Sequence, residues 1–383
     1  MDVQHKFDSL SEHMSLETDG EPSPAVPPAC GTSQRNPPGV VYSAAAGGKR
    51  VKLLKTLLTS ACERDCLYCP FRAGRDFRRE TMQPDELSNA FNSMYHAGSV
   101  EGLFLSSGIA GGGLKTQDRI IAAAEILRQK LGYRGYLHLK LMPGSERNQV
   151  ERAMQLADRI SINLEAPNEL RLGKLAPHKD YWKELITPLK WANEIKLSRP
   201  RELGWNGRWP SLTTQFVVGA VGETDVELLS TSEFLYHQLH LARTYFSAFN
   251  PVSDTPLENQ PPENPLRQLR LYQSAFLLRD YGYTLEDLQF EPDGCLPLKL
   301  DPKKAWAEEN LSCLPVEINN ANRAELLRIP GIGPKTATKL LAAKQQGILR
   351  DFSDLKRFGI PLEKAAPYIL INGKKPTRQM SLW

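Results

Sequence analysis

The sequence of 383 residues predicts an α/β fold, a partial (β/α)6 barrel followed by a small all-α domain. Two observations lead to this fold class. Strand-like and helix-like segments alternate from about residue 50 to residue 290, and the six strands lack the closing pair of a complete eight-stranded barrel. Beyond them, two helical segments flank a turn rich in glycine and proline within a basic tail.

The composition is that of a folded protein, since 41% of the residues are apolar and 24% are charged. The length indicates more than one domain. The sequence contains no apolar run of about 18 residues that would predict a membrane-spanning helix, and its polar N-terminus does not resemble a secretory signal. We therefore expect a cytoplasmic protein with no membrane partner. In that compartment clustered cysteines indicate metal binding or catalysis more often than disulfides.

Changes in composition give the predicted domain boundaries. Residues 1–45, rich in Pro, Ser and Gly, are expected to be disordered or loosely ordered. Residues 46–290 form the barrel, 291–315 a linker punctuated by proline, 316–372 a pair of helical hairpins, and 373–383 a basic tail. From residue 316 onward, twelve Lys or Arg oppose five Asp or Glu, a net charge of +7, within a chain whose total is +4. A nucleic-acid partner is therefore expected at the tail.

Short apolar runs and periodic segments define the elements of the barrel. The expected strands lie within 54–61, 101–108, 135–144, 158–168, 212–224 and 242–252, and the expected helices within 116–132, 145–157, 225–240 and 261–288.

Side-chain alternation in two of these strands predicts a polar inner face of the barrel. Residues at alternate positions share one side of a strand. The polar positions are Tyr136, His138 and Lys140 in one strand and Ser161, Asn163 and Glu165 in the other, opposite Leu137, Leu139, Leu141, Ile160, Ile162 and Leu164. If helices cover the apolar side, the polar side faces the interior and holds a ligand. His138, Lys140 and Glu165 are candidates for contacts in this cavity.

Three of the six cysteines, Cys62, Cys66 and Cys69, follow the first strand with the spacing C-x3-C-x2-C. Three interpretations compete. Structural zinc normally takes four protein ligands, and no fourth Cys or His is close in sequence. A disulfide would leave one thiol over and would need an oxidising compartment. A [4Fe–4S] cluster held by three thiolates leaves one iron open for a substrate or cofactor, so the incomplete ligand set favours it.

This motif, with Tyr68 just before the last cysteine, resembles the signature of the radical S-adenosylmethionine (SAM) superfamily, whose members have a six-stranded partial barrel. The resemblance implies that Cys62, Cys66 and Cys69 bind a [4Fe–4S] cluster and act in catalysis. It also implies that SAM binds the open iron and is cleaved to methionine and a 5′-deoxyadenosyl radical. A low-potential electron donor is then required.

The resemblance also implies contacts to SAM, residue by residue. Ser106, Ser107 and Gly108 match the Gly-Gly-Glu motif that holds the methionine amino group, although the acid is missing here. Asn163 or Glu165 would lie near the ribose. The adenine would be bordered by Tyr68, Val218 and Gly219.

The tail contains a second motif, Pro-Gly-Ile-Gly-Pro at 330–334, between two helical segments. Glycines there leave backbone N–H groups exposed at the start of the next helix, a site suited to phosphate. The segment resembles the helix-hairpin-helix module, which grips DNA without reading its sequence. The resemblance implies nucleic-acid contacts by Gly331, Ile332, Gly333, Lys335 and Thr336, and residues 352–369 look like a second, degenerate copy.

Other features remain open at this level. The run of Arg72, Arg75, Arg78 and Arg79 is either a solvated surface or a guide for phosphate. The isolated Cys30, Cys295 and Cys313 are expected to be ordinary thiols, with Cys30 placed to fold over the barrel mouth.

From about residue 50 to 370 the sequence resembles a bacterial family of radical SAM proteins assigned to DNA modification or repair, which implies a DNA base or nucleotide as substrate and a DNA-repair partner protein. One alternative is an RNA-modifying radical SAM enzyme, since "VGAVGETD" at 218–225 is similar to a methylthiotransferase segment. The other is a DNA-binding protein whose iron–sulfur cluster senses redox state without catalysis.

Overall fold

The computed structural model describes residues 3–13, 40–44, 50–347 and 349–375. The chain divides into two compact units. One comprises Met1–Glu223 and Phe234–Asn264, and the other Thr224–Glu233 and Pro265–Trp383. None of the helices in the described ranges is long and apolar enough to cross a membrane.

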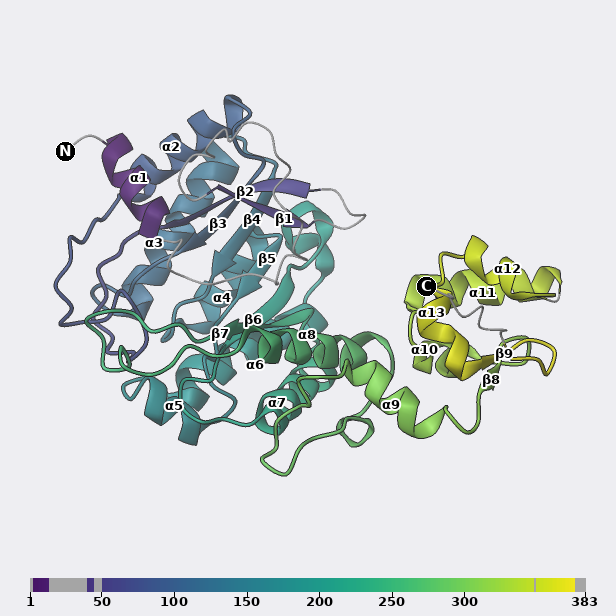
Figure 1. The fold of residues 1–383 in the computed structure, drawn as a ribbon. Coiled ribbons are helices and arrows are strands. Elements are labelled where there is room, and N and C mark those ends of the chain that lie inside the picture. Colours follow the sequence, from purple (N-terminus) through teal and green to yellow (C-terminus); the bar gives the residue numbers. More distant parts are fainter. Residues whose placement is uncertain (1–2, 14–39, 45–49, 348, 376–383) are drawn as a thin grey trace, which may run out of the picture. The chain divides into compact units, whose positions relative to one another are not determined.

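A seven-stranded sheet in which spatial order follows chain order forms the centre of the first unit (Figure 1). Its strands are β1 Val40–Ala44, β2 Arg50–Leu57, β3 Gly102–Ser106, β4 Tyr136–Lys140, β5 Arg159–Ser161, β6 Ser211–Val218 and β7 Arg243–Ala248. Strands β2 to β7 are parallel, which confirms the predicted partial barrel of six strands. Strand β1, which lies in the region expected to lack structure, pairs antiparallel with β2 at the sheet edge.

Helices connect the parallel strands. Those of the first unit, with α7 shared between the units, are α1 Val3–His13, α2 Pro84–His96, α3 Gly113–Glu125, α4 Arg147–Leu156, α5 Glu169–Leu175, α6 Thr187–Ser198 and α7 Asp225–Gln238. A π-helical turn, Ile126–Lys130, continues α3, and another, Tyr181–Ile186, precedes α6. Helices were expected at α3, α4 and α7, whereas α1, α2, α5 and α6 were missed. Helix α1 shows that residues 3–13 are ordered within the segment predicted to be loose.

The apolar face of the sheet is buried as the side-chain alternation predicts. Leu103, Leu105, Leu137 and Leu139 are 0% exposed. Burying such a side chain contributes roughly 1.5–3 kcal/mol. This face carries the stability of the sheet, which leaves its other face available for polar groups.

A buried arginine fixes the turn between α3 and β4. The Arg128 guanidinium donates hydrogen bonds to the carbonyl oxygens of Tyr133, Gly135 and Leu156 at 2.8–2.9 Å, and it pairs with Asp158 at 3.0 Å. Four acceptors therefore depend on one cation whose side chain is 1% exposed.

The second unit has a core of its own. Its elements are α8 Pro265–Asp280, α9 Pro302–Asn310, α10 Arg323–Arg328, α11 Pro334–Gln346, α12 Phe352–Arg357, α13 Leu362–Ala365, and the parallel strands β8 Val316–Glu317 and β9 Ile369–Leu370. Part of the predicted linker is helix α9, whose Ala307 belongs to this core together with Leu311 just after the helix. Pro302 stands at the first helical position, where a missing N–H costs nothing.

The contacts of Arg128 lead to a stability prediction. Arg128→Met leaves three carbonyls and the Asp158 carboxylate without their buried donor, so we expect a loss of about 3–5 kcal/mol in the free energy of unfolding. Urea denaturation followed by circular dichroism measures this loss. Arg134→Met removes an exposed arginine from the same turn and should leave the transition nearly unchanged. Equal midpoints for both variants would contradict the assigned role.

Candidate active site in the first unit

A cavity of about 420 Å³ lies in the first unit and is lined by all three motif cysteines. Cys62, Cys66 and Cys69 lie on the loop that follows β2, here called the cysteine loop, residues 58–83. The opposite walls come from β4, β6 and β7, with Lys140, Gln215 and Ser247, and from the segments that follow the strands, such as that of Asn163. Parallel strands bring their carboxyl ends to one edge, which is where ligands bind in such sheets.

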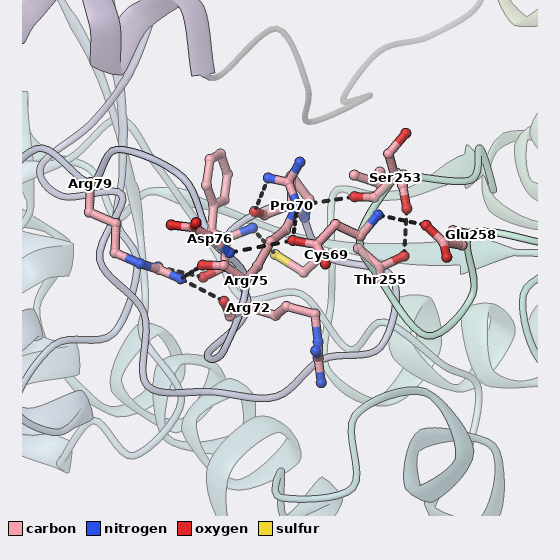
Figure 2. Close-up of polar contacts among 12 residues, drawn as sticks. Cys69, Pro70, Arg72, Arg75, Asp76, Arg79, Ser253, Thr255 and Glu258 are labelled. Atoms are coloured by element: carbon pink, nitrogen blue, oxygen red, sulfur yellow. Dashed lines mark hydrogen bonds and ion pairs between the residues drawn. The ribbon is translucent and has the colours of Figure 1, made fainter.

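Arginines hold the shape of the cysteine loop from within (Figure 2). The Arg79 guanidinium donates to the carbonyl oxygens of Ser60, Phe71, Arg72 and Arg75 at 2.7–3.2 Å. It also lies 4.4 Å from the centroid of the Phe77 ring. A single guanidinium can join separate parts of a loop in this way because it has several N–H donors in a rigid geometry.

Arg75 attaches the cysteine loop to the segment after β7 (Figure 2). It donates to the carbonyl oxygens of Pro70 at 2.9 Å and Ser253 at 3.1 Å. Arg78 forms an ion pair with Glu80 at 2.7 Å. Arg75, Arg78 and Arg79 therefore serve the loop itself, which answers the question that the sequence left open about this basic run.

The segment after α5 closes the other side of the cysteine loop. Arg64 binds the carbonyl oxygen of His178 and the carboxylate of Glu184. The His178 ring pairs with Asp65 at 2.7 Å. The loop is thus tied to two cavity walls that are far from it in sequence.

Two of the three sulfurs accept a hydrogen bond from a backbone nitrogen. The Ile109 N–H donates to Cys62 Sγ at 3.5 Å, and the Phe71 N–H donates to Cys69 Sγ at 3.4 Å. Such donors favour the thiolate form, which is the form that binds iron.

Burial works against ionisation of the middle cysteine. Burial raises the pKa of the Cys66 thiol, and the positive charge of Lys179 opposes that rise. A charge on Cys62 raises the same pKa, so the two sulfurs are close enough to interact. Within the described ranges no three His, Cys, Asp or Glu side chains form a ready-made metal-ion site. The donor set is nevertheless three soft thiols on one cavity wall, which suits an iron–sulfur cluster.

Glu165 and Lys179 form a buried ion pair in the cavity. Lys179 Nζ lies 3.0 Å from Glu165 Oε1, and the side chains are 8% and 7% exposed. Glu165 Oε2 is buried and has no hydrogen-bond partner among the described residues. Burial and then the Glu165 charge raise the pKa of Tyr68 well above its usual value, so this phenol stays neutral.

The structure brings most of the predicted SAM contacts to one cavity. Tyr68, Ser107, Gly108, Asn163 and Glu165 line it, as does the candidate Lys140. His138 lies deeper, with its ring nitrogen 2.8 Å from Ser161 Oγ. Ser106 lies outside the lining, and its hydroxyl is buried without a partner in the described ranges.

Val218 and Gly219 do not line the cavity, whereas Val217 does. Alternation along β6 explains the difference, because Val217 and Val218 point to opposite faces. Gly219 has φ +91°, and a Cβ there would lie 2.2 Å from Glu263. Gly219 thus permits the turn after β6.

Sequence reasoning missed Lys179, Arg64 and Gln215 among the lining residues. Lys179 lies beyond a helix that was not predicted, and no motif marks it. Cys30 falls outside the described residues. Cys295 is half-buried and Cys313 is exposed.

In the second unit the predicted hairpin is formed by α10, the turn at 329–333 and α11. Gly331 has φ +86°, and a Cβ there would lie 2.8 Å from the ring of Pro361 in the second hairpin. Gly333 caps α11, Ile332 is buried, Lys335 is exposed and Thr336 is half-buried. Lys303 of α9 supports the turn by donating to the Ile332 carbonyl oxygen at 2.6 Å. The second hairpin is a poorer site for phosphate, because its helix α13 has only four residues.

Comparison with known proteins assigns both regions. Residues 56–235 match the family model of the Radical SAM superfamily, and residues 316–343 match that of the Helix-hairpin-helix motif. No curated protein matches the chain.

Several solved structures are similar to part of the chain. Methylornithine synthase (PylB) is 15% identical with a TM-score of 0.47, over 61% of this chain and 64% of its own. The hydrogenase maturase HydG from Carboxydothermus hydrogenoformans is 12% identical with a TM-score of 0.47, over 59% of this chain and 51% of its own. A radical SAM methyltransferase from Sphaerobacter thermophilus is 14% identical with a TM-score of 0.43, over 62% and 70%. The chain thus spans less than two thirds of the first two.

The barrel and the thiol cavity agree with the family match, so the first unit carries a domain of the Radical SAM superfamily. The second unit carries a helix-hairpin-helix motif. Enzymes of this class use a [4Fe–4S] cluster and SAM, which are the cofactors of this domain.

The close approach of Gly108 to the cysteine loop gives a test of the site. A Cβ at Gly108 would lie 2.3 Å from the carbonyl oxygen of Ala61, the residue before Cys62. Gly108→Ala should therefore displace Cys62 and weaken cluster binding about tenfold or more, the effect of disturbing support behind a metal ligand. Iron and sulfide per chain after anaerobic reconstitution measure this.

Gly173→Ala provides the matched control, because a Cβ at Gly173 meets no atom within 4 Å. It should load as the unaltered chain does. A fully loaded Gly108→Ala protein would contradict the prediction.

Proposed function

We propose that the chain cleaves SAM reductively and uses the resulting radical to modify or repair a base or nucleotide in DNA. The observation that supports this most is that one chain has both a cavity lined by three thiols and a helix-hairpin-helix motif. Radical chemistry supplies the reaction class, and the motif supplies the class of substrate.

In this proposal Cys62, Cys66 and Cys69 hold the cluster. When bound, the cluster supplies the electron that cleaves SAM into methionine and a 5′-deoxyadenosyl radical. The protein itself binds and orients SAM and excludes water from the cavity. Arg79 and Arg75 fix the course of the cysteine loop.

The residues that line the cavity provide the proposed contacts to SAM. Ser107 and Gly108 adjoin Cys62 and are placed for the amino group of methionine. Asn163 and Glu165 carry oxygens that accept from ribose hydroxyls, and Glu165 Oε2 has a free acceptor position. Tyr68 and Val217 offer apolar surface to the adenine. Val218 and Gly219 would then contribute backbone rather than side chains.

Phosphate binding is proposed for the first hairpin. The N-terminus of α11, thirteen residues long, presents backbone N–H groups beside Lys335 and the Thr336 hydroxyl. The net charge of +7 from residue 316 onward supports a polyanionic partner. Backbone contacts of this kind carry no base information, so they suit an enzyme that acts at many sequences.

RNA is the alternative substrate, supported by the methylthiotransferase-like segment at 218–225. A redox sensor without turnover is a further alternative. The proposal also includes a low-potential electron donor, a cytoplasmic setting and a DNA-repair partner protein.

Turnover of SAM tests the enzymatic part. Anaerobically reconstituted protein with dithionite should release 5′-deoxyadenosine, and Cys69→Ala should abolish the release because one cluster ligand is lost. Liquid chromatography with mass spectrometry quantifies the product. A chain that carries a full cluster yet forms no product would refute the proposed enzyme activity and favour the redox-sensor alternative.

Charge reversal at the hairpin tests nucleic-acid binding. Lys335→Glu should weaken binding to duplex DNA at all sequences and lower the slope of log K against log salt by about one, since a phosphate contact is lost. Fluorescence anisotropy across a salt series measures both. Lys356→Glu makes the same charge change on exposed α12 and should have a smaller effect. Identical behaviour of the two variants would assign binding to general charge.

A further inference from the structure

Lys179 places a buried positive charge in the wall of the cavity that the three motif cysteines line. The N–H donors to Cys62 and Cys69 described above belong to the backbone, so sequence changes leave them in place. The charge of Lys179 opposes the rise that burial causes in the pKa of Cys66. The reduction potential of an iron–sulfur cluster depends on local charge and on hydrogen bonds to the sulfurs, so a charged residue such as Lys179 can alter it.

The position of Lys179 is fixed from both sides. Its neighbour His178 pairs with Asp65, and the His178 carbonyl oxygen accepts from Arg64, so the segment is fastened to the cysteine loop. The next residue, Asp180, accepts from the N–H groups of Trp182 and Lys183 and thereby begins the following helical turn. The ammonium is therefore held in the wall of the cavity.

Glu165 holds the ammonium from the cavity side. It does so in a left-handed backbone conformation with φ +65°, which a residue with a side chain adopts at a cost. A buried ion pair is a weak source of stability because both charges lose their water. A strained, desolvated pair next to a cofactor site is better explained by what it does there.

We propose that Lys179 is a positioning residue that raises the reduction potential of the cluster through its buried positive charge, and that Glu165 moderates this effect. The inference rests on the proposed ligation of the cluster by the three cysteines. The step concerned is the uptake of one electron by the cluster from the low-potential donor, with no bond made or broken. A nearby cation stabilises the added negative charge, whereas the carboxylate partly cancels that stabilisation.

Two substitutions should shift the potential in opposite directions. Lys179→Met should lower the midpoint potential by about 59 mV, which is a tenfold change in a one-electron equilibrium. Glu165→Gln should raise it, because Lys179 then lacks its counter-charge. Lys179→Arg keeps the charge and should restore most of the original value. A residue with only a structural role would not produce this pattern of signs.

The measurement is a redox titration of the full-length, anaerobically reconstituted chain without SAM, followed by electron paramagnetic resonance of the reduced cluster. Lys140→Met is the matched control. Lys140 is also a buried lysine of the cavity wall, but it lies on β4 and not on the segment that is fastened to the cysteine loop. It should shift the potential by less than half as much.

The outcomes separate the two proposals. An unchanged potential in Lys179→Met, with SAM affinity reduced, overturns the inference and makes Lys179 a ligand of the cosubstrate. Equal shifts for Lys179→Met and Lys140→Met also overturn it. Failure of the unaltered chain to take up any cluster would refute the proposed function together with the inference.

Discussion

The parallel pairing of β2 with β3, continued into the loops beyond both strands, is the constraint on which the site depends. The Leu58 N–H bonds to the Ser106 carbonyl oxygen at 2.9 Å, and the Gly108 N–H to that of Thr59 at 2.7 Å. This backbone pairing carries the cysteine loop onto the end of β3 and leaves no room for a side chain at Gly108. This pairing also positions the next residue, Ile109, whose N–H donates to Cys62 Sγ.

Regular alternation made much of this predictable. The apolar positions of β4, such as Leu137 and Leu139, are fully buried, while Lys140 faces the cavity as expected. A strand repeats every two residues, so inner and outer faces can be assigned without knowing the neighbours. The same rule would have selected Val217 over Val218. The family resemblance placed the adenine contact one residue too far along the strand relative to the cavity lining.

Features that depend on tertiary contacts could not be predicted. Arg79 looked like part of a surface charge run, because the four carbonyls that it joins come together only when the loop has folded. Lys179 lines the same cavity as Cys66 although more than a hundred residues separate them, and it follows a helix with a short and weak pattern. The prolines of residues 291–315 indicated a linker, although Pro302 is well suited to begin α9. In each case the residue type was compatible with two roles, and a distant partner decided between them.

The dimensions of the site bear on how a nucleic acid could be the substrate. A cavity of about 420 Å³ cannot admit a duplex, and its walls are the closely tied loops of a single unit. Under the proposed function the target nucleotide must therefore leave the base stack or come from a single strand, at a cost of a few kcal/mol that is smallest for damaged or mispaired bases. The hairpin does not reduce that cost selectively, because it grips backbone. Discrimination between normal and altered bases would then arise from the ease of extrusion and from the fit to the cavity, which makes a repair reaction easier to specify than the modification of an intact base.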